Sequence, residues 1–330
     1  MKNKSVINKV FTYYRYTFYV IHNKEEIELK KVLNPVLLLA IVTMLVASVF
    51  SATSNVLASE KSGQATEVDL KVMTYNLRYL NDNDPSPHTW AERIPAIKKL
   101  IHQEQPDIFG TQEVLYQQLK DLETNIENYD WIGLGREGGS KGEYSAIFYN
   151  KNRYSPLEYD HFWLSDTPDV IGSKTWGNNI PRMVTWAKFL DNKSKESFYV
   201  VNTHFDHQSA NAREKSAKLI IEKIKEFDAE LPIILTGDFN TSPDSVPHQT
   251  LTSEDAFVDL WNTAEVRINE NLGTFNGFHD VTGGGPERRI DWVLGKGNVF
   301  THRIEILNDY KNGQFPSDHY PVIADVTLSY

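Results

Sequence analysis

The chain of 330 residues contains no cysteine. Its absence excludes thiol catalysis, a disulfide framework, cysteine-ligated metal sites and a cysteine-borne lipid anchor. Long repeats and low-complexity tracts are also missing, and hydrophobic residues make up 40% of the chain against 24% charged residues. This composition is typical of an ordinary globular protein, and the length suffices for one large α/β domain with a substantial core.

Positive charge is scarce beyond the first 58 residues. From residue 59 onward, 27 Lys and Arg stand against 41 Asp and Glu, a formal net charge of −14. A surface of this sign does not attract long polyanions through its average field. The balance therefore disfavours a tight, nonspecific nucleic-acid binder, but it leaves open an enzyme that binds such a substrate locally through a metal ion.

The N-terminal extension, residues 1–58, carries the longest uncharged run. Lys30 and Lys31 precede residues 32–58, whose apolar part spans residues 36–50. That length is typical of the apolar region of a signal peptide and is shorter than the roughly 20 residues of a spanning helix. We expect export with cleavage after Ala58; the alternative is an uncleaved membrane anchor formed by residues 32–58.

A polar linker over residues 59–67 and a single domain over residues 68–330 follow. Apolar periodicity predicts helices over residues 90–105 and 210–227. Strands are predicted over residues 70–76, 106–114, 143–150, 183–189, 197–205, 231–239, 289–295 and 320–328. Many strands with few helices between them predict two packed sheets flanked by helices, rather than a doubly wound nucleotide fold. Residues 160–182, rich in Asp, Gly, Pro and Trp, are expected to form a wall of a substrate cleft.

Polar side chains recur where these predicted strands end. Burying Asp238, which follows the apolar run LPIIL, costs several kcal/mol unless the carboxylate has a cation, a donor or a chemical role. Any one such residue is compatible with a turn, a surface charge or a satisfied histidine. Strand ends gather on one rim of a layered fold, so the joint pattern predicts a site there. The residues concerned are Asn76, Glu113, His204, Asp238, Asn240, Asp291, Asp318 and His319.

Seven collinear blocks resemble the endonuclease/exonuclease/phosphatase superfamily. They are MTYNLR, DIFGTQEV, GEYSAIFYN, VVNTHFDH, ILTGDFNTSP, RRIDWVL and PSDHYPVIADV. The resemblance covers about residues 68–328 and looks closest to an uncharacterised bacterial branch. It implies a four-layer α/β sandwich and the hydrolysis of phosphate esters.

The resemblance also implies a metal centre. Glu113 looks like the principal ligand, with Asn76 beside it and Asp318 completing or approaching the ion. Oxygen ligands without cysteine suit a hard cation, so we expect Mg²⁺ or Mn²⁺.

The GDFN block carries the groups that act on water and phosphate in this family. Asp238 would orient or deprotonate the attacking water, and Asn240 would hydrogen-bond the phosphate or that water. Because they are two residues apart, both are expected on the same side of the strand. His319 is similar to the histidine that contacts the scissile phosphate, with Asp291 holding it in orientation.

The second histidine, His204, is expected to act as general acid or phosphate donor, with Glu143 in the place of its carboxylate partner. Arg182 matches an arginine that binds phosphate, the alternative being a surface salt bridge. In the Gly-rich loop 273–289, Phe275 and Phe278 either stack on a base or sugar or simply pack the loop.

These expectations together describe an exported, divalent-metal-dependent phosphoesterase acting on a mono- or diester. The expected substrate is a phosphorylated small molecule or a short nucleic acid, and no protein partner is implied. The alternatives are a nuclease on single-stranded nucleic acid, a phospholipid phosphodiesterase, and a catalytically inactive binding domain. No basic insertion for duplex DNA and no hydrophobic hairpin for a membrane is evident in the sequence.

Overall fold

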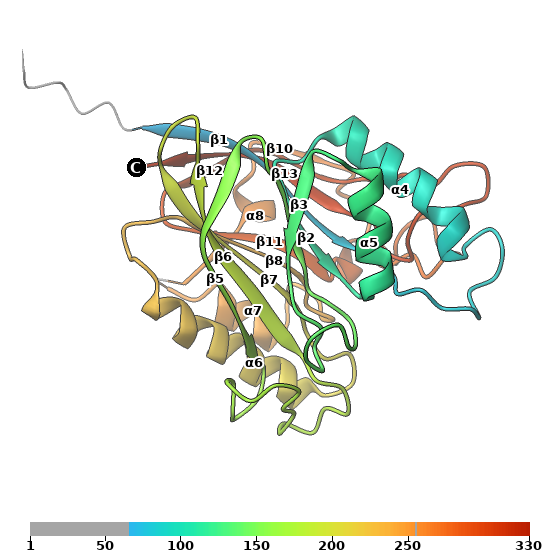
Figure 1. Ribbon diagram of the computed structural model, residues 1–330, viewed down its shortest axis with the longest axis horizontal. Helices are drawn as coiled ribbons and strands as arrows, with labels where there is room; N and C mark the ends of the chain where they lie inside the picture. The colour runs from blue at the N-terminus through green and yellow to red at the C-terminus, as the bar shows by residue number, and fades with distance from the viewer. Residues whose placement is uncertain (1–65, 255) are drawn as a thin grey trace, which may run out of the picture. The chain divides into compact units, whose positions relative to one another are not determined.

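The computed structural model describes residues 66–254 and 256–330. In this part of the chain two β-sheets lie against each other and helices cover their outer faces (Figure 1). The expected signal peptide or anchor within residues 1–58 lies outside the described residues, as does nearly all of the linker 59–67. None of the described helices combines the length and the apolar character needed to cross a membrane.

The first sheet, as described, has the strand order β10-β12-β13-β1-β2-β4-β3. Its pairs are antiparallel except for β1 with β2 and β10 with β12. The strands are β1 (Glu67–Asn76), β2 (Ile108–Gln112), β3 (Tyr129–Ile132), β4 (Ile147–Asn150), β10 (Val266–Ile268), β12 (Val299–Ile306) and β13 (Val322–Ser329).

The second sheet has the order β5-β6-β7-β8-β11-β9. Its strands are β5 (Tyr154–Trp163), β6 (Met183–Asp191), β7 (Ser197–His204), β8 (Ile233–Asp238), β9 (Val258–Asp259) and β11 (Asp291–Lys296). Strands β7 and β8 are parallel, and helix α6 (Ala210–Lys223) connects them. A parallel pair requires such a crossover because the end of the first strand and the start of the second lie at opposite edges of the sheet.

Helices α4 (Trp90–Glu104) and α5 (Tyr116–Asn125) cover the first sheet, and α6 and α7 (Val246–Leu251) lie on the opposite side of the molecule (Figure 1). A short helix α8 (Leu260–Thr263) and the 3₁₀ turns η1 (Ile224–Glu226) and η2 (Pro286–Arg288) complete the described elements. Helix α6 begins where the Ser209 side chain accepts a hydrogen bond from the Ala212 amide, a standard N-cap.

The buried apolar residues form three layers that match this arrangement. Val72 packs between the sheets with Val200 and Val293. Met73, the next residue of β1, faces the α4 and α5 side, as the two-residue period of a strand requires. A third cluster lies under α6 and includes Trp292. The predicted four-layer sandwich is therefore confirmed.

Several predicted boundaries differ from the observed ones. The strand expected over 143–150 is regular only in β4, because Tyr144 forms an isolated bridge with Val114. The helix expected over 210–227 ends as α6 at Lys223 and continues as η1. Strand β5 extends to Trp163, so the irregular segment expected over 160–182 begins after it. Strands β3, β5, β9, β10 and β12 and helices α5, α7 and α8 were not predicted.

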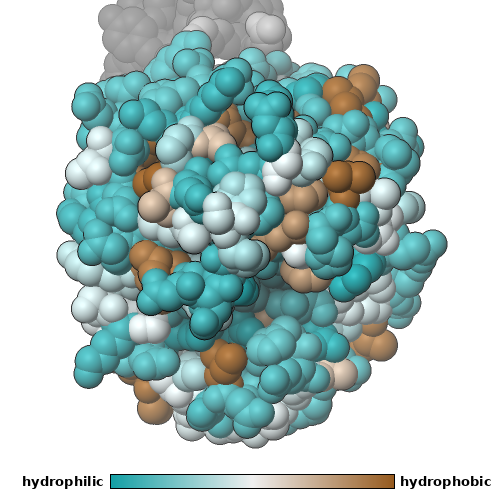
Figure 2. Space-filling model, turned by 90° about the vertical axis from the view of Figure 1, so that its right-hand side faces the viewer, coloured by the Kyte–Doolittle hydropathy of each residue, from teal (hydrophilic) through white to brown (hydrophobic). Residues whose placement is uncertain are grey.

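Figure 2 shows the face that lies on the right of Figure 1. Hydrophilic residues dominate this face, and the apolar ones form small, separate groups. A continuous apolar patch of several hundred Å² is what marks a protein or membrane contact surface. This face offers no such patch.

Candidate active site

Three neighbouring strand ends of the second sheet bring polar side chains side by side. In the strand pairing, Asp238 at the end of β8 lies opposite His204 at the end of β7 and opposite Asp291 at the start of β11. Adjacent strands are about 4.8 Å apart, so these side chains are immediate neighbours. The predicted convergence of strand-end residues is thus found here.

Two of the site residues have left-handed backbone conformations. Glu113, directly after β2, has φ 64°, and Asn240, two residues past β8, has φ 51°. Such angles are uncommon for residues other than glycine and cluster at functional sites. Asp238 and Asn240 both line the cavity, as expected, but strand alternation is not the cause. The strand ends at Asp238, and a turn instead places the Asn240 amide 2.9 Å from Asp238 Oδ1.

Asn76, the last residue of β1, links two carboxylates. Its Nδ2 donates to Asp238 Oδ2 at 2.9 Å and to Glu113 Oε1 at 3.2 Å. Its Oδ1 accepts from the Arg78 amide at 3.0 Å. In this arrangement Asn76 presents donors toward Glu113 and not the oxygen that a metal ligand would supply.

The pair of His319 and Asp291 has the predicted geometry. His319 Nδ1 lies 2.9 Å from Asp291 Oδ2, and its Nε2 lies 3.7 Å from Asp238 Oδ2. Burial lowers the pKa of His319, but the two facing carboxylates outweigh burial and hold it well above its usual value. The imidazole is therefore charged at neutral pH.

His204 is in the opposite state. Burial, followed by the Arg182 charge, holds the pKa of His204 well below its usual value. Asn240 Nδ2 lies 2.9 Å from His204 Nε2 and donates to it, so Nε2 is an acceptor and the ring is neutral. This geometry does not support the expected role of general acid, since His204 carries no proton at that nitrogen.

The expected pairing of Glu143 with His204 is corrected by the structure. Both Glu143 carboxylate oxygens bind the Arg136 guanidinium, at 2.6 and 2.8 Å. The main chains of the two residues also meet, because the Arg136 amide donates to the Glu143 carbonyl at 3.0 Å. Arg136 was missed in the sequence, although its position across the Gly-rich turn REGGSKGE from Glu143 signals a hairpin contact.

Arg182 is buried, so the alternative of a surface salt bridge is wrong. Its Nη2 lies 2.9 Å from His207 Nδ1, and its Nε lies 3.5 Å from Asp206 Oδ2. Its Nη1 is buried and has no hydrogen-bond partner among the described residues. An unpaired buried donor costs about 1–3 kcal/mol, which a bound acceptor would recover.

The two phenylalanines of loop 273–289 differ. The Phe278 ring stacks on His88 with centroids 4.6 Å apart, so it packs the loop. Phe275 instead pairs with His319 through an isolated bridge, with ring centroids 5.1 Å apart, and lines the cavity. The Arg288 guanidinium lies over the Phe275 ring, 5.2 Å from its centroid.

These side chains surround a cavity of about 610 Å³. Its lining includes every predicted site residue except Asn76 and Asp291, and adds three arginines and one histidine that sequence reasoning did not select. These are Arg78, Arg136, His207 and Arg288. Ile180 and Arg182 supply one side, so the end of segment 160–182 does form part of the wall.

The carboxylates in this cavity fit a divalent cation. Ligand atoms of Glu113, His204 and Asp238 lie within 4.8 Å of one another. Burial and the Glu113 charge raise the pKa of Asp318 to about 6, and burial and Asp291 raise that of Asp238 to about 7. A hard cation would offset this mutual repulsion, and oxygen donors are the ligands it prefers.

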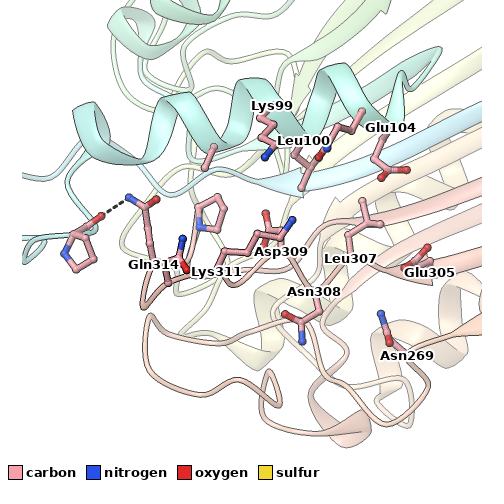
Figure 3. A pocket seen from close by; sticks show the side chains of 15 residues that line it. Lys99, Leu100, Glu104, Asn269, Glu305, Leu307, Asn308, Asp309, Lys311 and Gln314 are labelled. Carbon is pink, nitrogen blue, oxygen red and sulfur yellow. Dashed lines mark hydrogen bonds between the residues drawn. The ribbon is translucent and has the colours of Figure 1, made fainter.

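A second cavity, of about 570 Å³, lies between helix α4 and residues 305–316 (Figure 3). Gln314 Nε2 donates to the Pro87 carbonyl at 2.7 Å at one end of it. Asp309 is in its wall, with Oδ2 3.4 Å from the Tyr75 hydroxyl. The two cavities share no lining residue, so the second is separate from the site above.

The two-sheet sandwich and the acid, histidine and arginine side chains at its rim are those of a hydrolase that cleaves phosphoester bonds. The model of the Endonuclease/Exonuclease/phosphatase family matches residues 73–319, and the chain belongs to this family.

The relatives of the chain differ in the activity that their names give, and one of them is uncharacterised. A mannosyl-6-phosphatase from Bacteroides thetaiotaomicron superposes with a TM-score of 0.74 at 37% identity, covering 78% of this chain and 99% of its own. An uncharacterised protein of Acanthamoeba polyphaga mimivirus is 32% identical over 77% of this chain and 98% of its own length. A probable RNA exonuclease of Saccharomyces cerevisiae is 28% identical over 56% of this chain and 40% of its own.

Proposed function

We propose that the protein is a divalent-metal-dependent phosphoesterase that releases phosphate from a small phosphorylated molecule, with a phosphorylated carbohydrate as the first substrate to test. The unpaired Arg182 Nη1 in the wall of the cavity carries this proposal. A guanidinium donates two parallel hydrogen bonds to a phosphate group, and a buried one gains most from doing so. Bound phosphate would therefore satisfy Arg182 beside the acidic cluster.

The cation belongs to the same proposal. Glu113 would be its principal ligand, with Asn76 and Asp318 as the expected companions. The ligand atoms of Asp238 and His204 lie within 4.8 Å of Glu113 and could complete the set. Bound Mg²⁺ or Mn²⁺ would polarise the phosphoryl oxygen and stabilise the charge that develops on it. Because Asn76 presents donors, its oxygen would face a cation only after the amide rotates.

The protein's own groups divide the remaining work. Asp238 would orient the attacking water, since it is surrounded by both histidines and by Asn76. His319, charged and held by Asp291, would donate a hydrogen bond to a phosphate oxygen. His204, being neutral, would serve as a hydrogen-bond partner rather than as the proton source.

The preference for a small substrate rests on two observations. The relative with 37% identity that covers nearly its whole length is named for a sugar phosphate. In addition, the chain from residue 59 onward is strongly acidic, which disfavours long polyanions. Export through residues 32–58 is also proposed, either with cleavage after Ala58 or as an anchor.

A nuclease acting on short single strands is the second candidate. Phe275 at the cavity, with Arg288 over its ring, is an arrangement on which a base can stack. The yeast relative is a probable RNA exonuclease. A phospholipid substrate has less support, because the face in Figure 2 lacks a continuous apolar patch.

One experiment separates these candidates. The purified protein is incubated with Mg²⁺ or Mn²⁺ and either mannose 6-phosphate or end-labelled single-stranded oligonucleotides, and released phosphate and shortened strands are measured. The controls are Asp238→Asn and the exposed Asp244→Asn. Phosphate release that Asp238→Asn alone abolishes supports the proposal. Shortened strands without phosphate release favour the nuclease, and no product with either cation would refute metal-dependent hydrolysis of both substrates.

A further inference from the structure

Four arginines line the catalytic cavity, and three have partners. Arg78 binds Asp84 at 3.0 Å, Arg136 binds Glu143, and Arg182 contacts Asp206 and His207. Arg288 differs, because no carboxylate among the described residues hydrogen-bonds it or forms an ion pair with it. Its guanidinium is exposed at the cavity and carries an uncompensated positive charge.

The Arg288 side chain is held in place despite its exposure. On one side it lies over the Phe275 ring. On the other side its stem packs on Gly284, where an added Cβ would come 2.5 Å from Arg288 Cδ. The Arg288 carbonyl also accepts a hydrogen bond from the Thr274 amide at 3.0 Å, which fixes its backbone to the residue before Phe275.

A confined arginine loses less side-chain entropy on binding than a free one. The carboxylate of Asp280 in the same loop accepts hydrogen bonds from Thr282 and from the Gly284 amide. The loop therefore leaves this cation free while fixing its direction. Such an arrangement suits the recognition of an anion.

We propose that Arg288, braced by Phe275 and Gly284, binds a second anionic group of the substrate while Arg182 and the acidic cluster receive the scissile phosphate. This inference rests on the proposed function and refines it. The preferred substrate is then a small molecule with two anionic groups, such as a sugar bisphosphate, rather than a simple monophosphate.

The test compares glucose 1,6-bisphosphate with glucose 6-phosphate. Binding of both is measured calorimetrically in EDTA, so that turnover is not needed, and phosphate release is measured separately with Mg²⁺ or Mn²⁺. The variants are Arg288→Gln, Arg288→Lys and Gly284→Ala, and the matched control is Arg267→Gln, an exposed arginine on β10 outside the cavity.

The wild type is expected to bind the bisphosphate about tenfold more tightly than the monophosphate, since one charge-assisted hydrogen bond contributes on that order. Arg288→Gln should reduce this preference to less than about threefold and raise KM for the bisphosphate with little change in kcat. Arg288→Lys should restore part of the preference. Gly284→Ala should lower it, because the new Cβ meets Arg288 Cδ and because a φ of 84° at this position strains an alanine. Arg267→Gln should keep it.

Equal affinity for the two sugars in the wild type would overturn the inference. So would a preference that survives in Arg288→Gln, or an equal loss on both sugars. If the wild type keeps the binding preference but releases phosphate from neither sugar, the second-anion site stands and the proposed hydrolysis of sugar phosphates falls.

Discussion

Arg93 of helix α4 is a fully buried cation whose removal should cost several kcal/mol. Its Nη1 donates to the carbonyls of Leu77 and Pro316, both at 2.8 Å, its Nε to that of His88 at 2.9 Å, and its Nη2 to that of Arg78 at 3.2 Å. None of these acceptors is a carboxylate. The guanidinium thus joins three separate stretches of main chain from inside the protein.

Two of these stretches lead into the catalytic cavity. Leu77, whose carbonyl Arg93 binds, directly follows Asn76. Pro316, the second acceptor, directly precedes Ser317 and Asp318. Arg93→Met removes four hydrogen bonds and leaves four carbonyls without this partner. At about 1 kcal/mol for each, the variant should lose about 4 kcal/mol of unfolding free energy.

Urea unfolding of Arg93→Met and Arg93→Lys measures this loss. Arg93→Lys keeps the charge but not the planar fork, so it should lie between the wild type and Arg93→Met. Lys99→Met, an exposed position on the same helix, should change the free energy by less than about 0.5 kcal/mol. A loss below about 1 kcal/mol in Arg93→Met would refute the reasoning, because the four bonds would then contribute almost nothing.

Three further outcomes are expected. Burial raises the pKa of Asp309 to about 7; the folded state therefore holds a proton that the unfolded chain releases near pH 4, and unfolding free energy should fall by roughly 2–3 kcal/mol from pH 5 to pH 8 through this group. In urea unfolding, the free energy of Asp309→Asn relative to the wild type should therefore rise by about 2–3 kcal/mol between pH 5 and pH 8. A difference that stays constant with pH would contradict this prediction. Asp291→Asn should lower kcat at least about 100-fold, because His319 loses its carboxylate partner; retention of a tenth of the wild-type rate would count against this role. EDTA should abolish phosphate release and added Mg²⁺ or Mn²⁺ should restore it, whereas full activity in EDTA would exclude a metal-dependent reaction.

The sequence was sufficient to predict where the site residues at the ends of regular strands would lie. Asp238 follows a buried apolar run and Asp291 begins one. A buried carboxylate costs several kcal/mol unless it has a cation, a donor or a chemical role, so these positions indicate a site. Strand pairing then places the two opposite each other, as the rim argument requires. The contact between Asp291 and His319 was predictable from the resemblance alone, because Asp291 begins β11 but His319 lies in the irregular segment before β13.

Contacts made through irregular backbone were not predictable in this way. Glu143 meets Arg136 because Gly138 and Gly139 adopt positive φ angles in the turn between them, and apolar periodicity contains no information about such a turn. Asn240 reaches His204 only because the chain leaves the strand after Asp238. In both cases the predicted residue lines the cavity, and a turn decides which side chain it contacts.

Arg93 is a different kind of omission, because its signal was present. It precedes Ile97 by four residues and Leu100 by seven, so it lies on the apolar stripe of its helix. A charged residue in that stripe must find buried acceptors. The sequence could therefore have predicted a structural cation, although not which carbonyls it would bind.

The two histidines show how the fold assigns different roles to one residue type. Both approach Asp238 Oδ2, His204 Nε2 at 3.5 Å and His319 Nε2 at 3.7 Å. Burial lowers both pKa values. At His204 the Arg182 charge adds to this effect, whereas at His319 the carboxylates of Asp291 and Asp238 outweigh it and raise the pKa. A proton acceptor and a proton donor thus flank the same carboxylate within a single cavity. Since that difference arises from burial together with the charges that neighbouring segments place beside each ring, exchanging the roles of the histidines would require rebuilding both sides of the rim.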